Sequence, residues 1–582
     1  MCGIHAVLSA ASSHHDISPD LKRRLVNRGP DYLGEATRRV GVGGAWSLRF
    51  TSTVLALRGD HVAHQPLVDS SETGSVLCWN GEAWRLGGQP VDGNDGEAIF
   101  SRLTKASALS PTVACQERDD IILDVFRGVE GPFSFVYFDE PTETLYYGRD
   151  RLGRRSLMVA ESDDGTLILS SIAKACDPRW KEVEADGIYV LRLCSQQPLL
   201  SDDPAVSSSP HSPVLKHDWL AGNDHADFVS SIGRFNNSLP SAAATAGFAL
   251  KPSSPSVGML KQQLVDSLRL RVLLIPQPPL CAAADVTSRA RVAVLFSGGL
   301  DCTVLAKLTH ELLESDQEID LLNVAFENPR VIAQLEKEAK PGEVVDFYEA
   351  CPDRMTGRKS FTELERSCPG RTFRFVAVNV PYSETLAHRH QVVSLLYPHN
   401  TEMDLSVGYA LYFAARGKGF CANADPTSTS SSLVPYISPA RVLLSGLGAD
   451  ELFGGYGRHQ VAFTRAGYAG LADELLLDVG RLSKRNLGRD DRVMSHWGKE
   501  VRFPYLDERL VRWAIETPSW EKCDFENVDD AAGVKAGKRV LRLLALELGM
   551  ENVAREKKRA IQFGARTAKM ESGRVKGTTL IS

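Results

Sequence analysis

The second residue of the chain, Cys2 in Met1-Cys2-Gly3-Ile4, has the chemistry of a nucleophile. Methionine is efficiently removed before a small residue, and its removal would leave Cys2 with a free α-amine. Because an α-amine has a pKa of about 7.7–8.0, it can accept the proton of the thiol at neutral pH. One residue would then supply both nucleophile and base, although the four residues alone are equally compatible with a cysteine that stands there by chance.

Four short motifs follow Cys2. They are Arg28-Gly29-Pro30-Asp31, His64-Gln65-Pro66-Leu67, Asn80-Gly81-Glu82 and Asn94-Asp95-Gly96-Glu97. In this order, with GPFSFVYFD and GRDRLGRRSLM behind them, they resemble the class II glutaminase domain of asparagine synthetases over residues 1–195. The resemblance implies that Cys2 attacks the side-chain amide of glutamine and releases ammonia.

The resemblance also assigns roles to four polar positions. The oxyanion formed during the attack needs fixed hydrogen-bond donors, which the Asn80 side chain and the Gly81 N–H would supply. The α-amine of glutamine needs carboxylates, and Glu82 and Asp95 match the family's positions.

The arginine that binds the α-carboxylate of glutamine in this family has no counterpart in register. Counted back from Gln65, its position is occupied by Val54. Arg49 and Arg58 lie nearby in the sequence, so either one of them substitutes or glutamine binding is weak.

A second candidate site begins where the apolar run Val292-Ala293-Val294-Leu295-Phe296 leads into Ser297-Gly298-Gly299-Leu300-Asp301-Cys302. A glycine-rich turn between a buried strand and a helix presents backbone N–H groups to an anion, and the helix dipole adds to the attraction. Asp301 can hold Mg²⁺ between phosphates. The turn is not a Walker A loop because G-x-x-x-x-G-K-[ST] is absent, and taken alone it is also compatible with an ordinary turn.

This turn resembles the SGGxDS loop of enzymes that split ATP into AMP and pyrophosphate. The last serine of that motif is Cys302 here, which keeps the size but weakens hydrogen bonding to phosphate. Ser445-Gly446-Leu447-Gly448-Ala449-Asp450-Glu451 and Lys557-Lys558-Arg559 extend the resemblance to the catalytic domain of asparagine synthetases. SKRNLGRDDRVMSHWGKEVRFPYLD and KKRAIQFGAR resemble most closely the divergent eukaryotic asparagine synthetase domain-containing proteins.

The resemblance implies that ATP and Mg²⁺ bind at this second site. Asp301 and Asp450 would hold Mg²⁺, and Lys558 would neutralise pyrophosphate or the charge of the transition state, with the neighbouring Lys557 leaving that register open by one residue. The residues implied at ATP are Phe296, Ser297, Gly298, Gly299, Asp301, Cys302, Val324, Ser445, Gly446 and Asp450.

Leu447 is the main departure from the synthetase pattern. The family usually has a glutamate at this place, which is important for forming the acyl-adenylate. Leucine can neither accept a proton nor hold a cation, but lactam-forming relatives also replace this glutamate, so the change alone does not prove inactivity.

The elements that must position these residues fall into two regions. Short β-rich runs such as FSFVYFD and TLILSS fill residues 1–195, and an alternation of helices and apolar strands follows over 257–570. A Ser/Pro/Ala-rich linker at 196–256, with a docked segment around Trp219, a polar surface loop at 419–438 and a frayed tail at 571–582 are also expected. The resemblance implies an N-terminal nucleophile αββα glutaminase sandwich followed by a Rossmann-like ATP-pyrophosphatase α/β domain.

The composition is that of a globular protein. Of the 582 residues, 43% are hydrophobic and 24% are charged, and the net charge of −6 does not favour nucleic acid or an anionic membrane as partner. The 11 cysteines form no C-x-x-C pair, which favours reduced thiols in a cytoplasmic protein. No apolar run reaches the roughly 18–20 residues of a membrane helix.

Three functions are compatible with these residues. The first is a glutamine-hydrolysing, ATP-dependent amidotransferase that converts aspartate to asparagine. The second is a catalytically weakened relative that acts as a nucleotide-binding or protein-binding module, which Val54, Cys302 and Leu447 favour. The third is an amide ligase for another small carboxylate.

Overall fold

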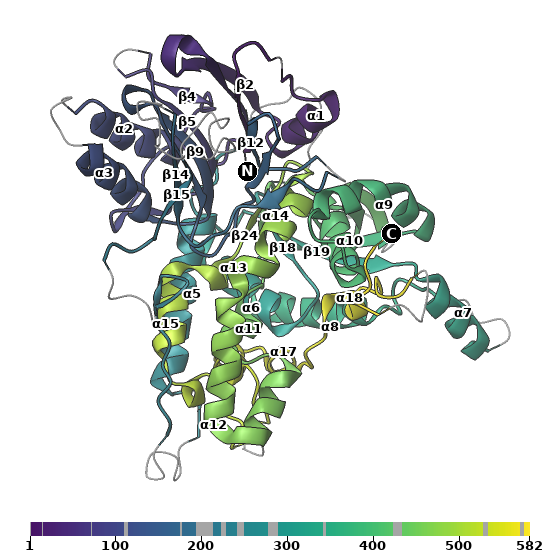
Figure 1. Ribbon diagram of the computed structural model, residues 1–582. Helices are drawn as coiled ribbons and strands as arrows, with labels where there is room; N and C mark the ends of the chain where they lie inside the picture. The colour runs from purple at the N-terminus through teal and green to yellow at the C-terminus, as the bar shows by residue number, and fades with distance from the viewer. Residues whose placement is uncertain are drawn as a thin grey trace. The chain divides into compact units, whose positions relative to one another are not determined.

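The computed structural model describes most of the chain (Figure 1). The described residues are 2–13, 15–70, 73–109, 115–174, 177–193, 213–222, 228–240, 249–277, 289–340, 345–422, 433–527, 533–570 and 576–581. They form two compact units. Unit 1 draws its residues from Met1–Ala226 and Leu482–Gly498, and unit 2 draws them from Asp227–Gln277, Cys281–Arg481 and Lys499–Ser582.

Unit 1 contains two six-stranded sheets, and the strand pairs within each are antiparallel. The first sheet has the order β13 (Lys181–Glu182), β11 (Met158–Glu161), β12 (Leu167–Ser170), β1 (Gly3–Ala10), β3 (Trp46–Val54) and β2 (Tyr32–Val40). The second has the order β15 (Leu215–His217), β14 (Ile188–Arg192), β10 (Thr144–Arg149), β9 (Phe133–Asp139), β5 (Val76–Gly81) and β4 (Leu67–Val68).

Alternation of side chains along the strands of unit 1 builds two cores. Because successive side chains point to opposite faces, Val76 and Cys78 of β5 pack with Ile4 and Phe50 of the first sheet, whereas Trp79 joins the core on the other face. That second core is covered by α2 (Asp95–Ser107) and α3 (Cys115–Arg127), which lie together beside the second sheet (Figure 1).

The outer layer on the other side of unit 1 is α1 (Pro19–Arg28), whose Leu21 and Leu25 pack against Ile172, which follows β12. The order of layers is therefore helix, sheet, sheet, helix. This is the predicted αββα sandwich of an N-terminal nucleophile glutaminase.

Unit 2 is built on a seven-stranded sheet. Its order is β22 (Leu433–Ile437), β21 (Lys418–Ala422), β20 (Phe373–Val380), β19 (Ile319–Phe326), β18 (Val292–Leu295), β23 (Val442–Leu444) and β24 (Glu500–Arg502). The five strands from β20 to β24 in this order are parallel, and β21 and β22 add an antiparallel edge.

The sheet of unit 2 is wound outward from its centre. The chain starts at β18, moves to β19 and β20, and returns to β23 on the other side of β18. Helices connect and cover the strands, including α5 (Pro255–Val272), α6 (Leu300–Leu312), α8 (Pro352–Ser367), α9 (Tyr382–Leu396) and α10 (Glu402–Arg416). The carboxyl ends of β18 and β23 are thus a topological switch point, where open α/β sheets bind ligands. The Rossmann-like α/β fold predicted for the second domain is confirmed.

Several predicted segments differ in the structure. The described ends of the predicted loop at 419–438 belong to the edge hairpin of β21 and β22, while 423–432 lie outside the described residues. The predicted frayed tail is wrong for 576–581, because the main chain there accepts from and donates to residues 400–403. Leu482–Gly498, predicted as part of the second domain, belongs to unit 1.

Part of the predicted linker is ordered structure. Trp219 is buried in the core shared by the second sheet, α2 and α3, and its indole N–H donates to the Ala185 carbonyl at 3.0 Å. Further on, β16 (Phe228–Val229) and β17 (Gly233–Arg234) form a short hairpin in unit 2. The stretches 194–212, 223–227 and 241–248 lie outside the described residues.

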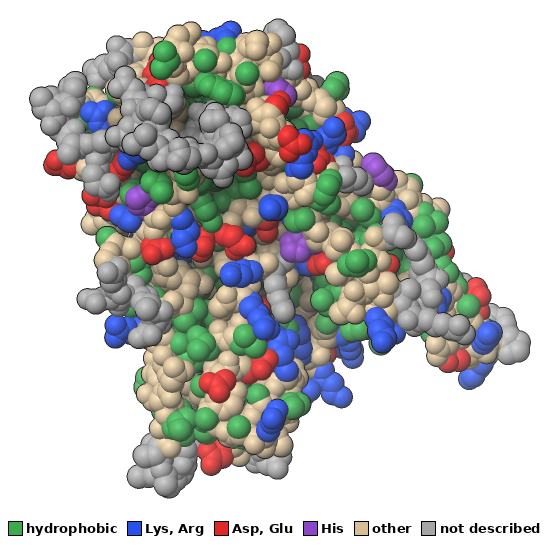
Figure 2. All heavy atoms as spheres, in the orientation of Figure 1, with side chains coloured by type: hydrophobic (Ala, Val, Ile, Leu, Met, Phe, Trp, Pro, Cys, Tyr) green, Lys and Arg blue, Asp and Glu red, His purple; other side chains and the backbone are tan. Residues whose placement is uncertain are grey.

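Acidic and basic side chains both occur over the face shown in Figure 2. Among the described residues, no helix combines the length and apolar character needed to cross a membrane.

Candidate functional site

Cys2 lies directly before β1, 7% exposed, beside the end of β5. Its backbone N–H donates to Oδ1 of Asn80 at 2.9 Å, and Nε2 of Gln65 lies 3.8 Å from its Sγ. Asn80 is held in turn, because its Nδ2 donates to Oγ of Ser134 on the paired strand β9 at 3.3 Å. The structure therefore brings together the predicted nucleophile and the predicted oxyanion donor, from segments 78 residues apart.

Gly81 follows Asn80 at a point where no larger residue fits. A Cβ there would lie 2.5 Å from the Pro132 carbonyl oxygen and 2.6 Å from Cβ of Phe133. This close approach of β5 to β9 explains why glycine stands next to the predicted oxyanion donor.

The two carboxylates predicted to bind the α-amine of glutamine are both buried. Oδ2 of Asp95 accepts hydrogen bonds from the Trp79 indole at 3.0 Å and from the Ala83 backbone at 2.7 Å. Burial raises the pKa of Asp95, and the nearby Arg58 guanidinium opposes that rise. Glu82, 2% exposed, has its Oε2 3.6 Å from Nη1 of the same arginine.

Of the two neighbouring arginines named above, Arg58 is the one that reaches this site. Its Nη2 also donates to the Val91 carbonyl at 2.7 Å, and the side chain is buried. Arg49 instead pairs with the exposed Asp16 at 3.4 Å. Val54 is buried at the end of β3. Arg58 thus supplies positive charge beside Glu82 and Asp95, the two carboxylates that the family resemblance assigns to the α-amine of glutamine.

The second candidate site starts with the turn after β18. Gly298 has φ of +78°, and a Cβ there would lie 2.5 Å from the backbone of Gly357, so both space and conformation require glycine. The turn leads directly into α6. Sγ of Cys302 contacts the Gly299 carbonyl at 3.3 Å and Oγ of Ser297 at 3.7 Å, so the thiol is engaged within the turn.

Asp301 and Asp450 converge on a lysine that sequence reasoning did not identify. Nζ of Lys538 lies 2.7 and 2.8 Å from the two carboxylate oxygens of Asp301 and 2.8 Å from Oδ1 of Asp450. Lys538 is 2% exposed and has φ of +54°, in the left-handed region. In the sequence it is one basic residue among many before an apolar helix, so no pattern indicated its position.

The opposite charges of this cluster shift one another's pKa values. Burial would raise the pKa of Asp450, but the ammonium groups of Lys538 and Lys558 hold it well below its usual range. Burial would lower the pKa of Lys538, but the carboxylates of Asp301 and Asp450 raise it above its usual range. Asp450 and Lys538 are therefore both charged near neutral pH, at the switch point of the sheet.

The turn after β23 lies against the turn after β18. A Cβ at Gly446 would be 2.8 Å from Cβ of Asp301, so glycine lets the two turns approach. Leu447 is half-buried, and its backbone N–H donates to Oγ of Ser445 at 3.3 Å. Lys558 contacts Asp450, whereas Lys557 is exposed and shows no contact with the two aspartates among the described interactions.

The remaining predicted ATP-binding residues, Phe296 and Val324, lie directly after β18 and on the neighbouring strand β19. Phe296 is buried directly after β18, and its carbonyl accepts from Nδ2 of Asn323 at 2.9 Å. Val324 is buried on β19, next to Asn323. Both side chains are apolar and buried near the carboxyl edge of the sheet.

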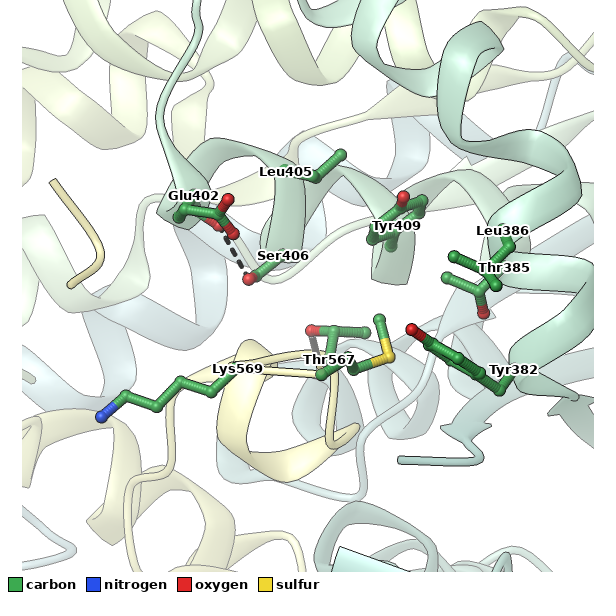
Figure 3. Close-up of a pocket in the computed structure, with 10 residues that line it drawn as sticks. Tyr382, Thr385, Leu386, Glu402, Leu405, Ser406, Tyr409, Thr567 and Lys569 are labelled. Atoms are coloured by element: carbon green, nitrogen blue, oxygen red, sulfur yellow. Dashed lines mark hydrogen bonds between the residues drawn. The ribbon is translucent and has the colours of Figure 1, made fainter. Parts of the chain in front are cut away.

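A separate pocket lies elsewhere in unit 2 (Figure 3). It is lined by side chains of α9, α10 and the segment after α18 (Ile561–Gly564), and Ser406 within it donates to the Glu402 carbonyl at 2.8 Å. Lys569 extends away from the other lining residues (Figure 3). None of the residues predicted at either site lines this pocket.

Two protein-family models match parts of the chain. The family model described as glutamine amidotransferase domain matches residues 1–199, and the model described as asparagine synthase matches residues 464–578. A solved glutamine phosphoribosylpyrophosphate amidotransferase from B. subtilis, at 12% identity, covers 65% of this chain and 81% of its own, with a TM-score of 0.24.

Curated relatives match almost the whole chain. Asparagine synthetase domain-containing protein 1 of Bos taurus is 35% identical, with 99% of this chain and 97% of that protein aligned. The Homo sapiens protein of the same name is 32% identical, over 98% of this chain and 96% of its own. Asparagine synthetase B (glutamine-hydrolyzing) of Escherichia coli is 22% identical, over 90% and 76%. The chain belongs to the asparagine synthetase family, and within it to the asparagine synthetase domain-containing proteins.

Proposed function

We propose that the chain is a glutamine-hydrolysing, ATP-dependent amidotransferase that forms an amide on a small carboxylate, with aspartate as the expected acceptor. The observation that carries the proposal is the convergence of Asp301 and Asp450, from two turns at the carboxyl ends of adjacent parallel strands, on Lys538. Two carboxylates and two lysines beside a glycine-rich turn suit a polyphosphate that arrives with a cation.

In the glutaminase step, the Cys2 thiolate would attack the side-chain carbonyl of glutamine. A C–S bond forms, the carbonyl oxygen becomes an oxyanion, and the Asn80 amide and Gly81 N–H would stabilise it. The C–N bond then breaks, ammonia leaves with the proton held by the α-amine, and water hydrolyses the thioester to glutamate.

The residues at the second site fit Mg²⁺ that is delivered with ATP. Mg²⁺ usually binds through one or two carboxylates, with phosphate and water completing its shell. Asp301 and Asp450 already share one cation, the ammonium of Lys538, and no group of three or more metal-ligating side chains occurs among the described residues. These two aspartates would hold Mg²⁺, which would supply positive charge between the phosphates.

The other residues of the second site would bind the phosphate groups of ATP and the pyrophosphate that leaves. The N–H groups of the turn at Gly298 and Gly299 would bind phosphate oxygens at the start of α6. Lys538 and Lys558 would neutralise the pyrophosphate as it leaves, while the acceptor carboxylate becomes an acyl-AMP. Ammonia would then displace AMP from the acyl carbon.

Leu447 favours a second candidate function, a relative that binds nucleotide without fast amide synthesis. Its side chain offers no base at the place where the synthetase pattern has a glutamate. In that case ATP and Mg²⁺ would bind with Asp301 and Asp450 as proposed, but the amide would form slowly or not at all.

One experiment separates these functions. Pyrophosphate release from ATP is measured with aspartate and other small carboxylates, with ammonium or glutamine supplied separately, and Asp301→Ala is the control for the second site. Cys2→Ala is expected to abolish turnover with glutamine but to leave turnover with ammonium. ATP binding without pyrophosphate release for any carboxylate would contradict the amidotransferase proposal and support the second candidate.

A further inference from the structure

Asp491 is a buried carboxylate of unit 1 that comes from the last fifth of the chain. It lies on α14 (Leu487–Ser495), all nine residues of which are buried. Charged side chains are seldom fully buried unless they are paired. Asp491 has Arg28 and Arg155 as partners, both with 0% side-chain exposure, at 2.9 and 3.6 Å.

One hydrogen-bond chain runs from Asp491 to the residue that carries the predicted nucleophile. Nη2 of Arg28 donates to Oδ2 of Asp491, and Nη1 donates to Oγ of Ser495 at 2.6 Å. The remaining nitrogen, Nε, donates to the Cys2 carbonyl at 3.2 Å. Two nitrogens of the Arg28 guanidinium therefore donate to residues of α14, and the third donates to the main chain of Cys2.

A second chain runs from the same oxygen to the predicted oxyanion donor. Oδ2 of Asp491 accepts from the Ser156 backbone N–H at 3.1 Å, and the Ser156 carbonyl accepts from Oγ of Ser134 at 3.2 Å. Oγ of Ser134 accepts in turn from Nδ2 of Asn80 at 3.3 Å. The two chains meet at one carboxylate oxygen and end on Cys2 and Asn80.

We propose that Asp491 is a positioning residue of the glutaminase site, which fixes the nucleophile and the oxyanion donor relative to each other through these two chains. The inference rests on the proposed glutaminase function. A site of this kind needs its groups held to within about 0.5 Å, and buried, hydrogen-bonded charges hold such geometry. Asp491 does not touch either group, so its effect is transmitted through Arg28 and Ser156.

The test compares Asp491→Asn with Asp119→Asn in the full chain. Asp119 is a matched control in unit 1, because it is also buried and pairs with an arginine, Arg192, but its hydrogen bonds lead to Tyr146 and not to Cys2. Two quantities are measured: glutamine hydrolysis, and the rate at which iodoacetamide alkylates Cys2, followed by mass spectrometry of the N-terminal peptide.

For Asp491→Asn, kcat for glutamine is expected to fall about 10-fold or more, with KM changing by less than about 2-fold, because the lost geometry matters in the transition state. Alkylation of the loosened Cys2 is expected to rise about 10-fold. Asp119→Asn should change neither quantity. Ser495→Ala removes only the hydroxyl that accepts a hydrogen bond from Arg28. It is the second test should Asp491→Asn not fold, and a smaller change of kcat and of alkylation in the same direction is expected.

Unchanged kcat and unchanged alkylation in a folded Asp491→Asn protein, or in Ser495→Ala where Asp491→Asn is unfolded, would overturn the inference. If the parent protein hydrolyses no glutamine but alkylation still responds to these variants and not to Asp119→Asn, the proposed function fails while the positioning role stands.

Discussion

If the proposed function holds, Leu447 is the residue that we expect to limit the rate of amide synthesis. When ammonia attacks an acyl-adenylate, its nitrogen becomes cationic and must lose a proton, and a placed base contributes roughly 10²–10⁴-fold. We predict that asparagine formation from aspartate, ATP and ammonium is slow, and that Leu447→Glu raises it at least about 10-fold. The measurement is asparagine formed per unit time by parent and variant.

Leu447→Gln is the matched control for that substitution, because it has the shape of glutamate without the charge. If Leu447→Gln raises the rate as much as Leu447→Glu does, the polarity of the side chain, and not a base, limits the reaction. A fast parent enzyme that Leu447→Glu leaves unchanged would show that this position does not limit synthesis.

Arg58 is predicted to stabilise unit 1 by compensating Glu82 and Asp95. Removing one partner of a buried ion pair costs about 3–5 kcal/mol, so Arg58→Met should lower the free energy of unfolding by that order. Arg49→Met, which removes a mostly exposed pair with Asp16, should cost less than about 1 kcal/mol. Urea denaturation of both variants checks this. A large rise in the glutamine KM for Arg58→Met without loss of stability would instead identify Arg58 as a carboxylate-binding residue.

Single residues could be predicted from the sequence where a motif fixes their spacing. Cys2, Asn80, Asp301 and Asp450 were identified in this way, and the structure brings each into its cluster. The role of Lys538 and the pairing of Arg28 with Asp491 could not be found, because Lys538 lies 237 positions from Asp301, Asp491 lies 463 positions from Arg28, and no local pattern links these residues. Long-range electrostatic partners require the tertiary structure.

At the scale of elements, the turn between β18 and α6 depends on Gly298. Alanine there must adopt positive φ and would place Cβ 2.5 Å from the Gly357 backbone, which cannot move like a flexible side chain. We predict that Gly298→Ala destabilises unit 2 by at least about 1 kcal/mol and weakens ATP binding more than about 10-fold. Calorimetric titration with Mg·ATP and thermal unfolding check both effects.

Gly258 on α5 is the control for that substitution, since a Cβ there meets nothing within 4 Å. Gly258→Ala should stabilise the helix by about 0.5–1 kcal/mol and leave ATP binding unchanged. ATP binding by Gly298→Ala that equals the parent's would show that the phosphates do not lie on this turn.

Asp353, in the first turn of α8, is expected to make the free energy of unfolding depend on pH. Burial raises the pKa of Asp353 from 3.8 to about 7, against the opposing effect of Arg559. Between these values the folded state binds more protons than the unfolded chain, so the free energy of unfolding should fall as pH rises from about 4 to about 7. The decrease is on the order of 3–4 kcal/mol, and it should be absent in Asp353→Asn.

Urea denaturation at pH 5 and pH 7.5 measures this dependence, with Asp473→Asn at an exposed position as control. A pH slope that is the same in parent and Asp353→Asn would show that Asp353 is ionised throughout this range.

Central strands of the sheets could be predicted because their patterns are local. FSFVYFD and LLNVAF are apolar runs of strand length, and both form central strands. The edge hairpin of β21 and β22 was missed, because the polar stretch at 419–438 predicts a surface loop, whereas exposed side chains alternate with buried or half-buried ones along the two strands. Edge strands depend on a neighbouring strand that the local sequence does not reveal.

At the scale of the whole molecule, unit 1 is assembled from two distant stretches of sequence. A fragment of residues 1–226 lacks α14, so Arg28 and Arg155 would both lose the Asp491 carboxylate that pairs with them. We predict that this fragment is less stable than unit 1 in the full chain by about 3–5 kcal/mol or does not fold. Appending residues 482–498 through a flexible linker should restore cooperative thermal unfolding. A fragment that melts like the full chain without this addition would contradict the prediction.

The insertion of α14 into unit 1 also has a consequence for how such genes can change over generations. A recombination event that exchanges the first 200 codons between distant members of the family would separate Arg28 from the Asp491 with which it evolved. Hybrids should therefore survive only where both parents carry a compatible pair, and a lineage that lost one partner would be under pressure to replace the other. Positions 28 and 491 are expected to change together.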